Sequence, residues 1–187
     1  MCQMSADFTL LYCRFLGNGG IMHKTLIVVD LQNDYISGSL GSKEAQNIIP
    51  NIVRKIQKCK EEGYEIIFTR DTHKKDYLET NEGCHLPIEH CIKGTLGWEI
   101  PKEIDVSSAT HINKKTFGYM GLKDFGFEDV ELIGLCTDTS VVSNALLIKA
   151  AFPEIRVAVD SSCCAGVSHE SHEAALMTMR MCQIEVI

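Results

Sequence analysis

Short apolar runs rich in β-branched residues alternate with amphipathic segments along this chain, and this alternation is the feature that most restricts its fold. The runs that predict strands are 25–31, 64–69, 110–113, 130–133, 155–160 and 183–187, and the segments that predict helices are 43–62, 139–152 and 168–181. Repeated strand–helix alternation builds parallel sheets with helices on both faces. The sequence therefore predicts an α/β protein with one doubly wound, Rossmann-like, mostly parallel six-stranded sheet.

Two helix starts are marked by serines. Ser42 is an N-cap candidate before an apolar face spaced three or four residues apart. Ser168 is an N-cap candidate as well, but the third residue after it is Ser171 rather than Glu or Gln, so no full capping box is expected. His169 and His172 in the same segment are interpreted as parts of a solvated helix N-terminus rather than as a metal pair.

Length and composition limit the classes of protein. The 187 residues are 45% hydrophobic and 23% charged with a net charge of -7, which fits one globular domain and does not favour nucleic acid or membrane partners. Nine scattered cysteines indicate buried thiols in a reducing, cytoplasmic compartment. We expect the domain at 22–187, with 1–21 as an extension that is either a translated leader before a start at Met22 or a disordered tail.

The carboxyl ends of the predicted strands carry most of the chemistry-bearing residues. Ligands of such sheets sit at these ends, which makes each end a site candidate. The candidates are Asp30, Asp71 with His73, Lys114, the turn 134–140, and the segment 160–164. One question is left open at this point, because Cys136 and Ser140 both lie in the turn where many α/β enzymes hold a nucleophile.

Five segments in order resemble the isochorismatase-like cysteine hydrolases, and especially their nicotinamidase/pyrazinamidase branch. They are VVDLQNDY (28–35), TRDTH (69–73), LPIEHCIKGTLGWE (86–99), NKKTFG (113–118) and GLCTDTSVVSNA (134–145). The resemblance implies an Asp–Lys–Cys triad that hydrolyses an amide through a thioester. It assigns the Asp to Asp30 and the Lys to Lys114, with Lys115 as a surface residue.

The resemblance also shows where this chain departs from its family. The family cysteine falls three residues after the Thr of the turn, and Thr137 makes that position Ser140. Cys136 falls in the oxyanion turn together with Ser140, where the family typically has a cis peptide, here Leu135–Cys136. Three explanations stay open: an engineered change, a natural variant with reduced or lost activity, or catalysis by Ser140 itself or by Cys136 or Cys163.

A metal site is predicted from a second group of residues. Asp71 and His73 point the same way in an extended chain, because they are two residues apart. The resemblance adds His90 from LPIEHC, and Glu82 is a further ligand with less support. A His/His/carboxylate set suits Zn²⁺ best, with Fe²⁺ or Mn²⁺ as alternatives.

The function implied is that of a nicotinamidase-like amidohydrolase. Its partner would be a small amide, such as a heteroaromatic carboxamide, and the resemblance favours a homo-oligomer. Candidates for lining the pocket around a flat ring are Tyr35, Trp98, Phe117 and Tyr119. Two alternatives remain: a catalytically silent ligand-binding or scaffold protein on the same fold, which Ser140 favours, and an amidase for another small amide.

Overall fold

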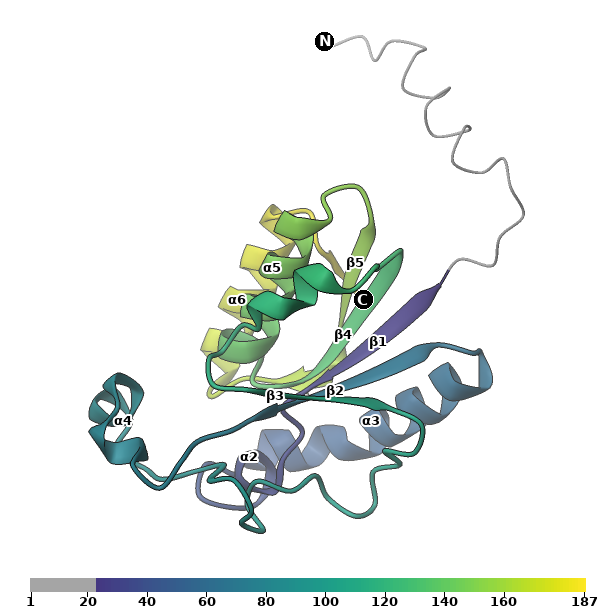
Figure 1. Ribbon diagram of the computed structural model, residues 1–187. Helices are drawn as coiled ribbons and strands as arrows, with labels where there is room; N and C mark the ends of the chain where they lie inside the picture. Colours follow the sequence, from purple (N-terminus) through teal and green to yellow (C-terminus); the bar gives the residue numbers. More distant parts are fainter. Residues whose placement is uncertain (1–22) are drawn as a thin grey trace, which may run out of the picture.

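A six-stranded sheet forms the centre of the molecule in the computed structural model, which describes residues 23–187 (Figure 1). The strand order is β3-β2-β1-β4-β5-β6, and every pairing in these residues is parallel. The strands are β1 (Lys24–Val29), β2 (Glu65–Asp71), β3 (Thr110–Lys114), β4 (Asp129–Leu135), β5 (Arg156–Ala165) and β6 (Glu185–Val186). The predicted fold class is confirmed, and the expectation for residues 1–21 lies outside the described residues.

Helices cover both faces of this sheet, as predicted. The α-helices are α2 (Asn33–Ile36), α3 (Lys43–Glu61), α4 (Asn81–His85), α5 (Val142–Ala151) and α6 (His169–Met181). In Figure 1, α3 lies on one side of the sheet, and α5 and α6 lie on the other. Two apolar clusters follow from this arrangement: Ile52 and Ile56 of α3 belong to one, and Ala145, Ile148 and Met179 belong to the other.

Local signals explain the ends of α3. The Ser42 hydroxyl oxygen accepts a hydrogen bond from the Ala45 backbone N–H at 3.0 Å, which satisfies one of the free donors of the first turn. Gly63 follows the helix with a φ of 77°, a backbone conformation that glycine adopts without a steric penalty. The helix predicted between these two residues is therefore present.

The start of α6 corrects one prediction. The Ser171 N–H donates to the Ser168 hydroxyl oxygen at 3.1 Å, and the Ser168 N–H donates to the Ser171 hydroxyl oxygen at 3.1 Å. A reciprocal capping box is thus present, because a serine hydroxyl at the third helical position reaches back as a Glu or Gln would. The prediction that Ser171 prevents the box was wrong.

The connections that face the carboxyl edge are irregular. The connection between β2 and β3 contains the 3₁₀ helix η1 (Tyr77–Glu79) and the short helix α4. Another 3₁₀ helix, η2 (Met120–Asp124), precedes β4, and a π-helical turn, η3 (Thr137–Val141), joins β4 to α5. Strand β5 is longer than predicted and continues to Ala165, past an irregularity in its pairing with β4 between Leu132 and Gly134.

Close approach of the two central strands brings the site elements together. Gly134 pairs with Val29 at a φ of 119°, and a Cβ at this position would lie 2.2 Å from the Val29 carbonyl oxygen. A larger residue would therefore push β4 away from β1. The turn after β4 and the residue after β1 consequently lie at the same edge. No helix among residues 23–187 has the length and apolar character needed to cross a membrane.

Candidate functional site

A buried ion pair lies at the carboxyl edge of the sheet. Asp30 directly follows β1 with a φ of 47°, and Lys114 is the last residue of β3. The Lys114 ammonium nitrogen lies 2.5 Å from an Asp30 carboxylate oxygen, and both side chains are fully shielded from solvent. The Thr69 hydroxyl donates to the other Asp30 oxygen at 2.7 Å. The two residues that the resemblance singled out are therefore in direct contact.

Ser140 completes a set of three. The Lys114 ammonium donates to the Ser140 hydroxyl oxygen at 3.3 Å, and the Ser140 side chain is 3% exposed. The serine sits in η3, where Asn144 of α5 donates to its carbonyl oxygen at 2.8 Å. By contrast, Lys115 is exposed and makes no contact of this kind. Acid, ammonium and hydroxyl thus form one continuous buried chain.

Electrostatics of the pair favour a proton acceptor at Asp30. Burial raises the pKa of the Asp30 carboxyl above its usual range, and the positive charge of Lys114 offsets only part of that rise. A carboxylate with a raised pKa is a better base than an exposed one. Asp30 is therefore suited to take a proton from a group beside Lys114.

The thiols near this edge are poor replacements for a cysteine at position 140. Burial raises the pKa of Cys136 to about 12, and the nearby carboxylates of Asp138 and Asp30 add to that rise. Burial likewise raises the pKa of Cys163 to about 11. Cys163 packs in the core on the α3 side of the sheet. Because the thiolate is the nucleophilic form, neither thiol is activated at neutral pH.

The turn after β4 has the backbone form that the resemblance implied. The Leu135–Cys136 peptide bond is cis. The Cys136 carbonyl oxygen accepts hydrogen bonds from the N–H groups of Thr139 at 3.2 Å and Val141 at 3.0 Å. These bonds fold the chain tightly around the segment that holds Ser140.

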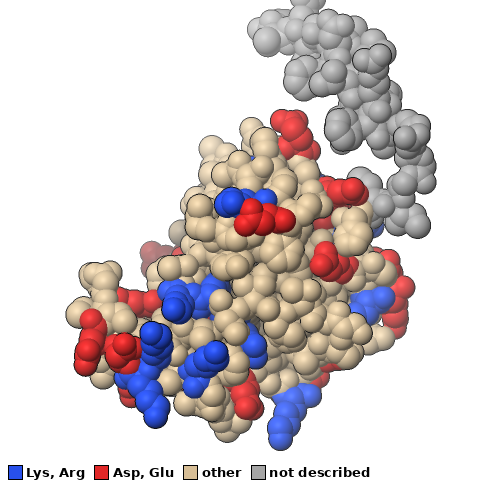
Figure 2. Space-filling view, in the orientation of Figure 1, with Lys and Arg blue, Asp and Glu red and all other residues tan. Residues whose placement is uncertain are grey.

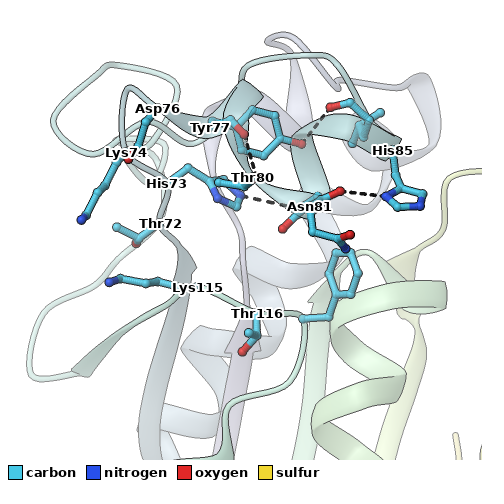
Figure 3. A pocket seen from close by; sticks show the side chains of 13 residues that line it. Thr72, His73, Lys74, Asp76, Tyr77, Thr80, Asn81, His85, Lys115 and Thr116 are labelled. Atoms are coloured by element: carbon cyan, nitrogen blue, oxygen red, sulfur yellow. Dashed lines mark hydrogen bonds and ion pairs between the residues drawn. The ribbon is translucent and has the colours of Figure 1, made fainter.

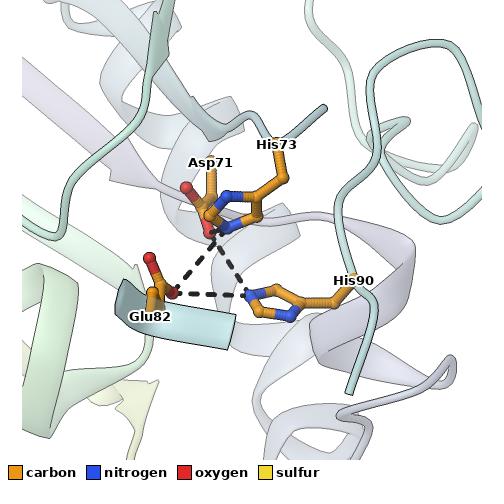
Figure 4. A group of neighbouring side chains, drawn as sticks. All are labelled: Asp71, His73, Glu82 and His90. Atoms are coloured by element: carbon orange, nitrogen blue, oxygen red, sulfur yellow. Dashed lines mark hydrogen bonds and ion pairs between the residues drawn. The ribbon is translucent and has the colours of Figure 1, made fainter. Parts of the chain in front are cut away.

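Four ligand-type side chains converge beside the ion pair (Figure 4). Asp71, His73, Glu82 and His90 each offer an atom within 4.8 Å of the others. Asp71 ends β2 and pairs with Lys114 in the sheet register, which places this cluster next to the triad. Glu82 comes from α4, and His90 comes from the irregular chain that follows it.

The spacing of this cluster combines one hydrogen-bond distance with three longer separations that suit a metal ion. The His73 Nε2 lies 2.9 Å from an Asp71 carboxylate oxygen. The His90 Nε2 lies 3.6 Å from Asp71 and 3.8 Å from Glu82, and the His73 Nε2 lies 3.7 Å from Glu82. These separations are too long for hydrogen bonds. They are close to the about 3.4 Å between two ligands of a tetrahedral ion with bonds of about 2.1 Å. The donor set therefore fits Zn²⁺, Fe²⁺ or Mn²⁺.

Neighbouring groups keep these side chains in the protonation states that bind a metal. The His90 Nδ1 donates to the Ile88 carbonyl oxygen at 2.8 Å, which leaves the Nε2 lone pair for the cluster. Tyr35 donates to Asp71 at 2.7 Å. Burial works to raise the pKa of Asp71, but its contacts with His73 and His90 and the positive charge of Lys114 hold it well below its usual range. Asp71 therefore stays ionised, as a metal ligand must.

A cavity of about 760 Å³ opens next to this cluster (Figure 3). Its wall includes His73, Tyr77, Glu82 and Phe117. The three triad side chains do not line it, since each is at most 3% exposed. The cavity thus borders the ligand cluster directly.

The four aromatic candidates have different positions. Phe117 is exposed and lines the cavity. The Tyr35 hydroxyl is bonded to Asp71, and the Trp98 indole N–H donates to the Thr72 hydroxyl at 2.8 Å. Tyr119 packs partly buried against the core on the α5 side. Of these four candidates for lining a pocket around a flat ring, only Phe117 lies in the wall of this cavity.

Two residues near the site were missed or undervalued in the sequence. Tyr77 is fully buried, and its ring packs against both His73 and His90 at 4.6 and 4.9 Å between centroids. His172 was expected to be solvated, but its Nδ1 lies 2.8 Å from the hydroxyl oxygen of Thr137 in the turn. That interpretation of His172 was wrong because the turn after β4 folds against the first turn of α6. His169 is exposed.

The fold and the site together define a class: a doubly wound α/β hydrolase with a nucleophile position at a strand–helix turn and a metal-ligand cluster beside it. Residues 24–187 match the Isochorismatase domain, so the chain belongs to the isochorismatase family. A nicotinamidase of Schizosaccharomyces pombe is 26% identical to this chain, in an alignment that covers 88% of this chain and 93% of that protein. This relative and the Mycobacterium tuberculosis relative described next support membership of the nicotinamidase/pyrazinamidase branch.

Further relatives agree with this assignment. A nicotinamidase/pyrazinamidase of Mycobacterium tuberculosis is 24% identical over 184 residues, covering 88% of this chain and 98% of that protein. The crystal structure of a Pyrococcus horikoshii pyrazinamidase in complex with zinc superposes with a TM-score of 0.79 at 27% identity. It covers 88% of this chain and 98% of that one.

Proposed function

We propose that this protein is a metal-dependent amidohydrolase that converts a small heteroaromatic carboxamide, such as nicotinamide, to the acid and ammonia. The observation that carries the proposal is the contact chain from Asp30 through Lys114 to Ser140, next to four metal-type ligands. The named activities of the relatives support the same reaction. Zn²⁺ is the proposed ion because the His/His/carboxylate donors suit it and a related pyrazinamidase was crystallised with zinc.

The residues of the chain have separate roles in the proposed reaction. Asp30 takes the proton of the nucleophile at position 140, and the Lys114 ammonium stabilises the resulting anion. The nucleophile bonds to the amide carbon while backbone N–H groups of the turn face the oxyanion. Asp30 then gives its proton to the leaving nitrogen, the C–N bond breaks, and ammonia departs. Water, deprotonated by Asp30, releases the acid and restores the nucleophile.

The ligand cluster has a positioning role in this proposal. Asp71, His73, Glu82 and His90 would hold the ion. A divalent ion held there would supply a Lewis-acid contact for a ring nitrogen of the substrate, which would orient its amide. Because Asp71 and Lys114 are paired in the sheet, the ligand cluster and the triad are neighbours at this edge.

Ser140 sets the expected level of activity. A serine hydroxyl is much less acidic than a thiol, and its partner Lys114 donates to it rather than accepting its proton. We therefore propose that the native chain is slow and that a thiol at this position restores fast turnover. Whether Ser140 is engineered or natural, the same physical argument holds.

A second candidate function follows from the same serine. A catalytically silent protein on this fold would keep the ligand cluster and the cavity and bind the amide without cleaving it. Ser140 is the observation that favours this alternative. The intact Asp30–Lys114 pair speaks for catalysis, because a buried ion pair is costly to keep where a silent protein gains nothing from it.

Ammonia release from nicotinamide tests both candidates. The full chain and its Ser140→Cys and Ser140→Ala variants are loaded in turn with Zn²⁺, Fe²⁺ and Mn²⁺. We expect the Cys variant to exceed the native protein by at least ~10²-fold, with the Ala variant at the background rate. Equal rates of the native and Cys forms would contradict the role given to Ser140. If no form is active while each binds metal, the nicotinamide assignment fails.

A further inference from the structure

A second cavity, of about 440 Å³, adjoins the ligand cluster and is bordered by lysines. Its lining is Thr72, His73, Lys74, Lys75, Ile92, Lys93, Asn113 and Lys115. The two cavities share part of their walls, because four residues line both: Thr72, His73, Lys74 and Lys115. We call this second space the lysine cavity.

The four lysines of this cavity are uncompensated. No carboxylate lies in its lining. Within residues 23–187, none of the four ammonium groups has a carboxylate within 4.0 Å, whereas Lys55, Lys60 and Lys114 each have at least one. The chain as a whole carries a net charge of -7. Figure 2 shows several basic side chains on the α4 side of the molecule, with acidic side chains next to them at the edge of the view. A positive site on an acidic protein is thus concentrated beside the ligand cluster.

The lysines reach the cavity from three separate segments. Lys74 and Lys75 follow β2 directly after His73, and Lys115 follows Lys114 at the end of β3. Lys93 is brought in by the backbone, because its N–H donates to the His73 carbonyl oxygen at 3.0 Å. In Figure 3, Lys74 and Lys115 extend to the same side of the pocket, opposite His85. The fold, rather than a basic run in the sequence, assembles this charge.

A neutral amide gains little from such a surface. Four positive charges do not attract an uncharged substrate, yet they do attract the carboxylate product of hydrolysis and slow its release. A substrate that itself carries a negative charge gains in encounter rate and in binding. The larger cavity has Asp76 and Glu82 in its wall, so an anionic group is favoured on the lysine side only.

We propose that the substrate is an anionic carboxamide, with a carboxylate or phosphate group, distant from the amide, bound in the lysine cavity. This proposal rests on the proposed amidohydrolase function for the amide end and adds the chemistry of the other end. The ring or chain between the two ends lies across His73, which borders both cavities. Specificity for the anion is assigned to Lys93 and Lys115, which come from different segments.

Calorimetric binding tests the proposal without turnover. The probes are nicotinamide and its 5-carboxylate, titrated into the zinc-loaded full chain carrying Ser140→Ala. The test variant adds Lys93→Gln with Lys115→Gln. The matched control adds Lys43→Gln with Lys102→Gln, two exposed lysines outside both cavities that also lack carboxylate partners in the described part of the chain. Both pairs change the net charge equally.

We expect the carboxylate probe to bind at least about tenfold more tightly than nicotinamide at low salt, with the preference shrinking as salt is added. The test pair should lose this preference and the control pair should keep it. Equal binding of the two probes, or equal losses in both pairs, would overturn the proposal. So would inorganic phosphate that binds as tightly as the carboxylate probe, since the cavity would then be a site for free anions.

Ammonia release by the Ser140→Cys variant separates this proposal from the proposed function. Lysine-dependent binding of the carboxylate probe with no hydrolysis of either amide would refute the amidohydrolase function but leave the anion site in place. If nicotinamide is hydrolysed and its 5-carboxylate is neither bound nor hydrolysed better, the anion site would be refuted and the amidohydrolase function would stand.

Discussion

The two halves of the site are built differently. Asp30, Lys114 and Ser140 stand at the ends of β1 and β3 and in the turn after β4, and none is more than 3% exposed. Glu82, His90 and the four lysines come mainly from the loop residues after β2, and the Glu82 side chain is 25% exposed. Rigid strand ends hold reacting groups to small tolerances, whereas loops vary freely. The difference suggests that the strand half sets the reaction and the loop half selects what enters it.

Asp71 joins the two halves. It is the last residue of β2, is paired with Lys114 in the sheet, and belongs to the ligand cluster. Gln32 fixes its backbone by accepting from the Asp71 N–H at 2.7 Å. Asp71 therefore fixes the position of a substrate bound by the loop half relative to the strand half.

The largest effect is expected from breaking the strand half. In the Ser140→Cys background, Lys114→Ala should lower kcat by at least ~10³-fold, because the nucleophile loses its stabilising charge. It should also lower the free energy of unfolding by about 3–5 kcal/mol, because Asp30 is left buried without its partner. Ammonia release and urea unfolding measure the two effects. Lys102→Ala, an exposed lysine outside both cavities, is the control and should stay within about 0.5 kcal/mol.

Breaking the loop half should weaken metal binding and leave the fold intact. His90→Ala should reduce zinc affinity by about 10²-fold, since one ligand is lost from the cluster. Competition with a zinc-binding dye measures the affinity, and thermal unfolding of the zinc-free protein checks the fold. His85→Ala is the control from the same loop, because His85 is exposed and faces the Asn81 carbonyl oxygen. An equal loss in both variants would contradict the assignment of His90.

Lowering the pH should weaken metal binding by the loop half. Burial works to lower the pKa of His90, but its contacts with Asp71 and the Ile88 carbonyl raise it above the usual range for histidine. Protonated histidine cannot bind metal, so zinc affinity should fall as the pH falls through this raised pKa, by up to about tenfold per pH unit. Asp71, with its lowered pKa, stays ionised throughout. A flat affinity between pH 8 and about 6 would refute this order of protonation.

A smaller effect is expected from the support of the turn. His172→Ala should lower kcat of the Ser140→Cys form by about tenfold, because Thr137 loses the contact that fixes the turn before the nucleophile. KM should change little, since His172 does not line either cavity. Steady-state kinetics separate the two parameters. His169→Ala on the same helix is the exposed control, and an equal change there would remove the positioning role.

The sequence predicted the strand half better than the loop half. Strand ends follow from apolar runs, so the proximity of Asp30 and Lys114 could be expected from the parallel topology alone. Glu82 could not be placed with the same support, because it sits on a five-residue helix inside a loop without a periodic signal. The lysine cavity was invisible for a similar reason, since its charges come from three segments whose approach depends on backbone contacts of His73.

Long-range packing explains the remaining errors. His172 reads as a solvated residue when only its own helix is considered, yet the turn after β4 packs against that helix. Tyr77 lies in a charged stretch of sequence, KKDYLE, and is nevertheless fully buried against two histidines. In both cases the contacting residue is distant along the chain or is positioned by an irregular loop, and a local sequence pattern predicts neither.

The central claim is that position 140 is the nucleophile position, and one measurement tests it most directly. The zinc-loaded Ser140→Cys variant is mixed with a carboxamide, quenched during turnover, digested and analysed by mass spectrometry. The account predicts an acyl group on the peptide that contains residue 140, and no such adduct when the same protein also carries Asp30→Asn. An adduct on Cys136, Cys91 or Cys163 instead, or ammonia release without any adduct at position 140, would contradict it.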